Sequence, residues 1–133
     1  MNQREIKFRV WLKNRDEMVY KGDGLYIDGF TGDIYIPHFE NPNQLDKMDD
    51  VILMQFTGLK DKNGKEIYEG DILMIEKYSD KPQVIEWGEQ FFESFYGMTG
   101  WKIKDSINYG FDSIEAKKSE VIGNIFESPE LLK

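Results

Sequence analysis

The stretch from Met54 to Ile72, MQFTGLKDKNGKEIYEGDI, decides the fold, because turn-forming and apolar residues are packed there at regular spacing. The pattern predicts a strand that ends at Thr57-Gly58, and a further strand that begins at Ile72 after a corner at Gly70-Asp71. Between them, Asn63-Gly64 is typical of a type I′ turn, in which both residues take positive φ. We therefore interpret the stretch as a structural element, in which two strands are connected by a tight turn and a corner.

The sequence before this stretch predicts short antiparallel strands. Apolar residues alternate with polar ones from Ile6 to Leu12, which indicates a half-buried strand with Arg9 and Trp11 on its outward face. Further strands are expected at Met18–Lys21, Leu25–Ile27 and Asp33–Ile36. Residues 37–50 are predicted to form a surface loop that has room for one helical turn at Gln44–Met48.

The second half of the chain continues the pattern of short strands. They are expected at Val51–Phe56, Ile72–Tyr78, Gln83–Trp87, Trp101–Lys104 and Glu120–Phe126. The spacing of Glu89–Tyr96 fits a strand or a helical turn, and we favour the strand. Gly97 and Gly100 are predicted to bracket a turn. DSIEAKK at 112–118 is typical of a short helix, and Ser128-Pro129-Glu130 indicates a terminal helical turn whose Leu131 and Leu132 can cover the core.

These elements together predict a fold class. Many short strands without a βαβ rhythm indicate a mainly β protein. A small SH3-type barrel with additional short strands, one short helix and a C-terminal helical turn would protect the strand edges. A length of 133 residues and 40% hydrophobic residues suit one domain over residues 1–133.

Composition excludes several classes of site. There is no cysteine, so disulfides and thiolate chemistry are excluded, and His38 is the one histidine. No apolar run approaches the roughly 18 residues of a membrane helix, so neither a membrane partner nor export is expected, and we expect a cytoplasmic protein. No pattern indicates a cofactor, and none indicates an oligomeric state.

The net charge of −8 is unevenly distributed. Residues 1–21 hold six basic and three acidic residues, whereas the rest of the chain holds 11 basic and 22 acidic. Nucleic acid binding depends on Lys and Arg, so the acidic balance disfavours it outside the N-terminal hairpin. Arg4, Arg9 and Arg15 of that hairpin are the candidate nucleic-acid contacts, and a solvated outer face explains them equally well.

Aromatic residues supply a second candidate site. Trp87, Phe92, Tyr96 and Trp101 could line a surface that grips a peptide or stacks on bases. A small barrel also needs bulky side chains in its core, so burial is the alternative interpretation of the same residues.

Carboxylates near the central stretch supply a third candidate. Side chains with oxygen atoms alternate from Asp61 to Glu66, as they do in a calcium-binding loop. The positions that such a loop requires to be carboxylates are occupied by other residues here, so calcium binding is not predicted. Local backbone hydrogen bonds explain Asp61 better. Glu66, Glu69 and Asp71 could hold a metal or act as acid and base, although solvated charge at a turn explains them as well. We therefore predict no metal site and no catalytic residue here.

Three segments resemble one known family. Leu53 to Ile72, Arg4 to Trp11, and Glu120 to Leu132 closely resemble the YopX family of bacteriophage and prophage proteins, and together they span nearly the whole chain. The resemblance implies a phage-encoded or prophage-encoded intracellular protein with a mainly β, SH3-type barrel. It implies no established activity and carries over no catalytic residue.

Three functions remain as hypotheses. The first is a non-enzymatic protein-binding module that acts on host or phage machinery through loops at about 20–50 and 89–118, since loops on a rigid scaffold often carry recognition. The second is a nucleic-acid-binding barrel that uses the basic N-terminal hairpin. The third is a metal-dependent enzyme built on the carboxylates of the central stretch.

Overall fold

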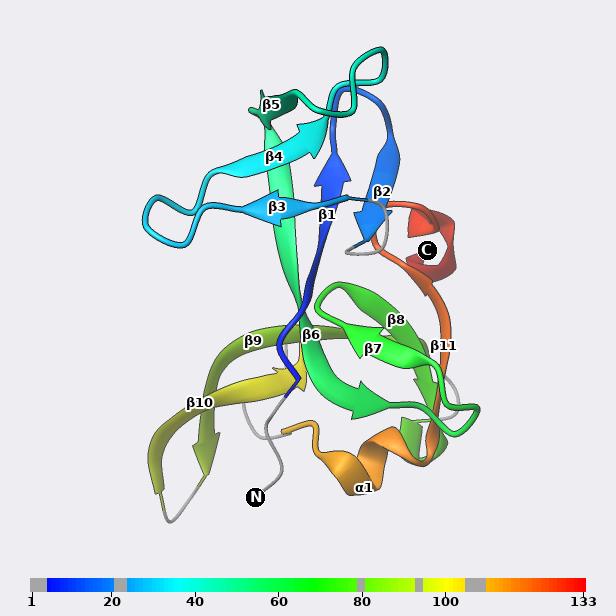
Figure 1. Cartoon of the computed structure of the whole chain (residues 1–133). Helices are drawn as coiled ribbons and strands as arrows, with labels where there is room; N and C mark the ends of the chain where they lie inside the picture. Colours follow the sequence, from blue (N-terminus) through cyan, green and yellow to red (C-terminus); the bar gives the residue numbers. More distant parts are fainter. Residues whose placement is uncertain (1–4, 21–23, 79–80, 93–94, 105–109) are drawn as a thin grey trace. The chain divides into compact units, whose positions relative to one another are not determined.

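The computed structural model describes residues 5–20, 24–78, 81–92, 95–104 and 110–133, without the side chains of 89–92 and 95–98. These residues are mainly antiparallel β strands with one short α helix, which confirms the predicted class (Figure 1). The strands are β1 Phe8–Leu12, β2 Glu17–Tyr20, β3 Tyr26–Ile27, β4 Ile34–Pro37, β5 Leu45–Met48, β6 Val51–Lys60, β7 Glu66–Tyr68, β8 Asp71–Ile75, β9 Gln83–Phe92, β10 Phe95–Ile103 and β11 Ser119–Asn124. The helices are α1 Ser113–Ala116 and the 3-10 turns η2 Glu76–Tyr78 and η3 Pro129–Leu132.

The described residues pack as two compact units. Residues 6–55 form one, called here the N-terminal unit, and residues 1–5 with 56–133 form the other, the C-terminal unit. Strand β6 runs through both, because its first half pairs with β1 and its second half pairs with β7. The expectation of a single domain stays a prediction, since two units that share a strand can fold together.

Two small sheets build the N-terminal unit. In the first, β1 lies between β2 and the start of β6. In the second, β4 lies between β3 and β5. Five apolar side chains form the buried core of the unit: Val10, Leu12, Val19, Ile34 and Ile36. This core draws on both sheets, so it covers one face of each sheet.

The prediction of a helical turn at Gln44–Met48 is wrong. This segment is the strand β5, which pairs with β4 in the register Ile34 to Met48 and Ile36 to Asp46. Met48 packs against the core of the N-terminal unit through that pairing. A long-range strand partner thus overrides the weak local preference of a polar segment.

The outward placement of Arg9 and Trp11 is also wrong. Both side chains are buried, and Arg9 is only 2% exposed. Strand β1 is central in its sheet and is buried along Arg9 to Leu12. Alternation of polar and apolar residues predicts one buried face, but it cannot show whether the second face is also covered.

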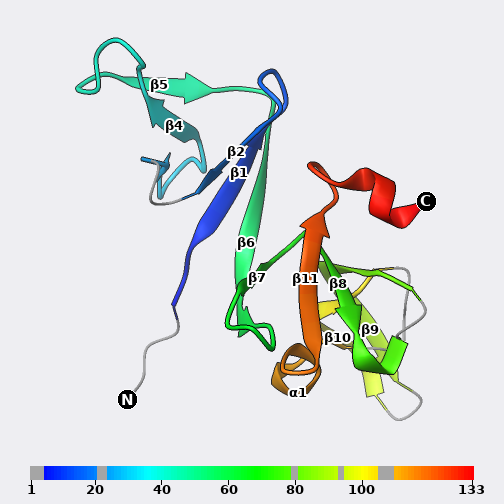
Figure 2. The ribbon, with the colours of Figure 1, turned by 90° about the vertical axis from the view of Figure 1, so that its right-hand side faces the viewer.

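The C-terminal unit contains a third antiparallel sheet, in the order β10-β9-β8-β11, together with β7 and the second half of β6. Figure 2 shows β11 beside β8, as their register requires. The turn expected between Gly97 and Gly100 is absent, because both glycines belong to β10, with Gly100 opposite Gly88 in β9. The core of this unit is Ile67, Leu73, Ile75, Ile85, Ile103, Phe111 and Ala116.

The central stretch differs from its prediction in detail. Strand β6 continues through Gly58 to Lys60. The turn that follows runs from Asp61 to Gly64, and the Gly64 N–H donates to the Asp61 carbonyl at 3.0 Å. Gly64 has φ 81°, whereas Asn63 is not among the residues with positive φ. The turn is therefore a type I turn followed by a left-handed glycine, and not type I′.

The two helical predictions near the C-terminus are confirmed in place. Helix α1 begins after Asp112, whose carboxylate accepts the N–H groups of Ile114 and Glu115 as an N-cap. The terminal turn η3 begins at Pro129, although Ser128 makes no side-chain cap hydrogen bond. Leu132 is exposed, so the expectation that it covers the core is wrong.

Candidate functional site

The polar residues of the central stretch serve the fold itself. Thr57 is buried and donates its hydroxyl to the Ile67 carbonyl at 2.7 Å. Asp61 is buried, and one of its carboxylate oxygens accepts the N–H groups of Asn63 and Lys65 at 2.8 and 2.9 Å. The predicted local hydrogen bonds of Asp61 are thus confirmed.

The second carboxylate oxygen of Asp61 makes a long-range contact. It accepts the N–H of Val121 in β11 at 2.9 Å, 60 residues along the chain. Burial by itself raises the pKa of Asp61, but the donors at Val121, Lys65 and Asn63 outweigh it and hold the pKa below its usual range. The charged carboxylate of Asp61 therefore connects the central turn to β11 through hydrogen bonds to both.

The three carboxylates proposed as a metal or catalytic site do not form a ligand set. Asp71 is buried, and it accepts the Tyr68 N–H at 2.8 Å, which closes the corner before β8. Within the part of the chain that the structure describes, no three side chains of His, Cys, Asp or Glu are arranged to hold a metal ion. Glu66 and Glu69 are half-buried on either side of Tyr68 in sequence.

The three arginines proposed as nucleic-acid contacts are not presented together. Arg4 lies outside the described residues. Arg9 is buried in β1, so its guanidinium is withdrawn from solvent, whereas Arg15 is exposed in the turn between β1 and β2. Only Arg15 of the three is therefore shown at the surface.

The structure describes two of the four side chains of the predicted aromatic surface. The side chains of Phe92 and Tyr96 lie outside the described part of the structure. Trp87 is 49% exposed, and Trp101, opposite it on β10, is half-buried, with their ring centroids 4.9 Å apart at 77°. Through this edge-to-face contact, Trp101 covers part of the Trp87 ring, which leaves less of that ring free to bind a partner.

Exposed apolar side chains gather instead in the N-terminal unit. Among the described residues, this unit carries seven large exposed ones: Ile6, Tyr20, Tyr26, Phe30, Phe39, Leu45 and Leu53. The larger C-terminal unit, whose side chains at 89–98 and 105–109 are not described, carries three among those that are: Trp87, Ile114 and Leu132. Phe30 is fully exposed (103%) and Phe39 is 83% exposed. Single exposed apolar residues are ordinary, but phenylalanines this open at loop tips need an explanation.

The outward face of the β3-β4-β5 sheet lies between the two loops that carry these phenylalanines. The register places Tyr26, Tyr35 and Lys47 in one row, because side chains opposite each other share a face. Two positions along, Pro37 and Leu45 form the next row. Tyr26, Lys47 and Leu45 are exposed, and Tyr35 and Pro37 are half-buried. The sheet thus presents a mostly apolar face to solvent.

The loop that carries Phe30 is held by its own polar side chains. Asp28 accepts the N–H groups of Phe30 and Thr31 at 2.8 and 3.1 Å, and its own N–H donates to the Asp33 carbonyl at 2.9 Å. Gly32 supplies the left-handed residue that the turn needs, with φ 77°. The hydrogen bonds from Phe30 and Thr31 lower the pKa of Asp28 below its usual range. Phe30 is therefore displayed on an ordered hairpin.

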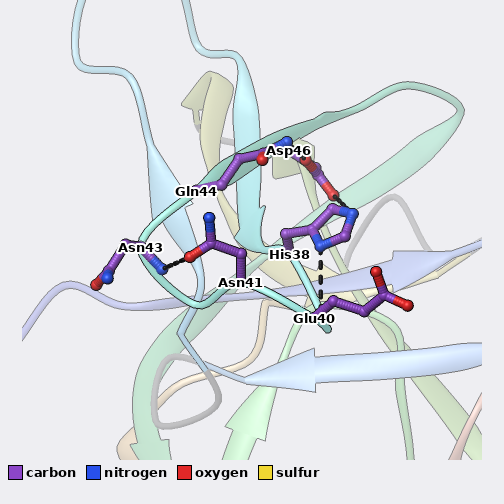
Figure 3. A network of polar contacts seen from close by, with 6 residues as sticks. All are labelled: His38, Glu40, Asn41, Asn43, Gln44 and Asp46. Atoms are coloured by element: carbon purple, nitrogen blue, oxygen red, sulfur yellow. Dashed lines mark hydrogen bonds and ion pairs between the residues drawn. The ribbon is translucent and has the colours of Figure 1, made fainter.

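The loop that carries Phe39 is ordered by a similar network (Figure 3). His38 Nδ1 accepts the Glu40 N–H at 3.2 Å, and His38 Nε2 lies 4.0 Å from a carboxylate oxygen of Asp46. Asn41 accepts the Asn43 N–H at 3.2 Å. The rings of His38 and Phe39 stack at 5.1 Å. The two loops leave opposite ends of β4, as Figures 1 and 2 show.

We call this region the aromatic face, comprising the side chains of Tyr26, Tyr35, Pro37 and Leu45 with Phe30 and Phe39 in the flanking loops. Sequence reasoning placed variable recognition loops near residues 20–50 but did not single out these side chains. The DGFTGD pattern at 28–33 is the signal that could have indicated Phe30, because aspartate and glycine around one aromatic residue are typical of a hairpin tip. Nothing comparable marks Phe39 in the sequence.

Comparison with known proteins gives a family and a solved structure. A family model described as YopX protein matches residues 7–133. The crystal structure of protein EF1440 from Enterococcus faecalis is similar, with 27% sequence identity and a TM-score of 0.57, and it covers 98% of this chain and 100% of that chain. No curated protein matches. Among the described residues, no helix has the length and apolar character required to span a membrane.

Proposed function

The chain belongs to the YopX family, and we propose that it acts as a non-enzymatic protein-binding module whose contact surface is the aromatic face. The single observation that carries this proposal is the full exposure of Phe30 on a hairpin ordered by Asp28. An exposed phenylalanine brings its own side-chain area to an interface without first leaving a packed core.

The hydrogen bonds that hold the two loops in one conformation support a binding role. Aromatic side chains dominate the energy of protein interfaces when they enter pockets of the partner. A loop that is already held in one conformation loses less entropy on binding than a mobile loop does. Asp28 and His38 provide such order for the loops of Phe30 and Phe39 through hydrogen bonds to backbone N–H groups.

We further propose that the module is encoded by a phage or prophage and acts in the bacterial cytoplasm on a host or phage protein. The resemblance of Leu53–Ile72 to phage and prophage proteins supports this setting. A small SH3-type barrel with additional short strands is part of the same proposal, and the antiparallel order β10-β9-β8-β11 is compatible with it.

The nucleic-acid alternative gains little support from the three candidate arginines. Phosphate contacts require exposed Lys or Arg side chains, and of the three candidate arginines only Arg15 is shown at the surface. The aromatic face lies in an acidic segment, where like charges would repel a phosphate backbone.

The proposal is tested by affinity capture from bacteria that produce the tagged protein. A double variant, Phe30→Ala with Phe39→Ala, should lose a partner that the unchanged chain enriches, while its thermal unfolding stays the same because both side chains are exposed. Trp87→Ala is the matched control, because it removes an exposed aromatic side chain from the other unit. A partner that is retained by the double variant and lost by Trp87→Ala would contradict the proposal.

A further inference from the structure

We propose that the partner of the aromatic face is a cationic protein segment, rich in Lys and Arg with interspersed apolar residues. This inference rests on the proposed function and adds the chemistry of the partner. It follows from the charge of the segment that carries the aromatic face.

Acidic residues outnumber basic ones in the segment that carries the aromatic face. Residues 24–50 contain six acidic residues and one basic residue, Lys47. The six are Asp28, Asp33, Glu40, Asp46, Asp49 and Asp50. Two of them flank the Phe30 loop, two accompany the Phe39 loop, and two follow β5. The segment therefore has a formal charge of −5, from one basic and six acidic residues.

Internal ion pairs neutralise this charge only in part. Lys47 lies 3.7 Å from Asp33, and Lys13 lies 3.2 Å from Asp50, both at exposed positions where such pairs are weak. Among the described residues, Glu40 and Asp49 have no ion-pair partner and are exposed. The Asp28 carboxylate holds two backbone N–H groups, so its charge is kept in place beside Phe30.

Aromatic rings and carboxylates together suit the side chains of Lys and Arg. A cation over the face of Phe or Tyr is attracted by the ring quadrupole, and neighbouring carboxylates add Coulomb attraction. The hydrocarbon stem of Lys or Arg can also lie along an apolar surface such as that of Tyr26 and Leu45. An anionic partner, whether nucleic acid, acidic protein or anionic lipid surface, would instead meet like charge.

The inference is tested by NMR with defined peptides and the full chain. A peptide of Lys-Leu-Arg repeats should shift the backbone amides of residues 26–48, and the shifts should weaken as salt is raised. A matched peptide of Glu-Leu-Asp repeats should leave these amides unchanged. Absence of shifts in residues 26–48 with the Lys-Leu-Arg peptide, or equal shifts with both peptides, would overturn the inference.

A charge variant separates this inference from the proposed function. Asp33→Asn, Glu40→Gln and Asp49→Asn together keep side-chain shape and leave Phe30 and Phe39 in place. We expect the variant to bind the Lys-Leu-Arg peptide about tenfold more weakly, and to lose the cellular partner that the unchanged chain captures. If the variant captures that partner as well as the unchanged chain does, the cationic chemistry is wrong while the binding role of the aromatic face stands.

Discussion

At the residue scale, Asp61 shows why the most recognisable segment of the chain is structural. Its carboxylate is buried and accepts three backbone N–H groups, two from its own turn and one from Val121. A neutral amide cannot reproduce this set, because one of its two ends is a donor. The aspartate is therefore required by the connection between the central turn and β11.

We predict that Asp61→Asn lowers the free energy of unfolding by about 2 kcal/mol at neutral pH, because a buried N–H group loses its acceptor. The pKa of folded Asp61 lies below its usual value, so the carboxylate stabilises the fold fully above about pH 4 and ceases to do so as the pH falls through the folded pKa. Urea unfolding as a function of pH should thus show a difference between the two proteins that shrinks on acidification.

Asp49→Asn is the control for this experiment, because Asp49 is exposed. It should leave the free energy of unfolding within about 0.5 kcal/mol of the unchanged chain. An Asp61→Asn variant as stable as this control at neutral pH would show that the three contacts do not carry the connection.

At the scale of elements, the Phe30 hairpin depends on the Asp28 side chain. We predict that Asp28→Ala increases hydrogen exchange at the amides of Phe30 and Thr31 several-fold, because both lose their acceptor. The amide of Glu40 in the other loop, which donates to His38, should be unchanged. Unaltered protection at Phe30 and Thr31 would mean that the backbone orders the loop alone.

The same contacts give the hairpin a pH dependence. The pKa of Asp28 lies below its usual range because the N–H groups of Phe30 and Thr31 bind its charged form. Protection of these two amides in the unchanged chain should therefore persist below the ordinary carboxyl pKa and fall only on further acidification. NMR-detected exchange over an acid pH series provides the measurement.

A second element, the C-terminal turn η3, packs closely against Gly123 of β11. An added Cβ at Gly123 would lie 2.8 Å from Ser128 Cβ and 3.0 Å from a terminal carbon of Leu131. We predict that Gly123→Ala destabilises the protein by about 1–3 kcal/mol, since the turn must move away. Gly29→Ala is the matched control, because nothing lies within 4 Å of its added Cβ. Chemical denaturation measures the free energy of unfolding of both variants. A Gly123→Ala variant as stable as Gly29→Ala would show that η3 does not pack tightly against Gly123.

At the scale of the whole molecule, the two units divide the roles. The C-terminal unit contains most of the central stretch, with its buried Thr57, Asp61 and Asp71 bound to backbone groups. The N-terminal unit contains the aromatic face, with Phe30 and Phe39 outside any core. The segment most useful for identifying the family is thus distinct from the proposed contact surface.

Local signals in the sequence predicted much of this fold. The capped start of α1 at Asp112, the hydrogen bonds of Asp61 within its turn, and most strands follow from short-range chemistry. The strand β5 and the continuation of β10 through Gly97 and Gly100 do not, because distant partner strands determine both.

The candidate site was less predictable than the fold. Burial of Arg9 depends on how β1 is covered, and alternation within one strand contains no such information. Exposure of Phe30 and Phe39 is likewise invisible in composition, because an aromatic residue in an unknown loop is expected to pack. Only their position in the ordered hairpins of the β3-β4-β5 sheet separates them from core residues such as Phe56.

The central claim is that the aromatic face, and not the C-terminal unit, meets the partner. Site-specific photo-cross-linking tests it most directly, with a benzophenone amino acid placed in turn at positions 30, 39, 87 and 114 of the full chain in bacteria. All four positions hold exposed apolar residues, two in each unit. We predict one discrete cross-linked protein from positions 30 and 39 and none from 87 and 114; cross-linking from 87 or 114 alone would contradict the account.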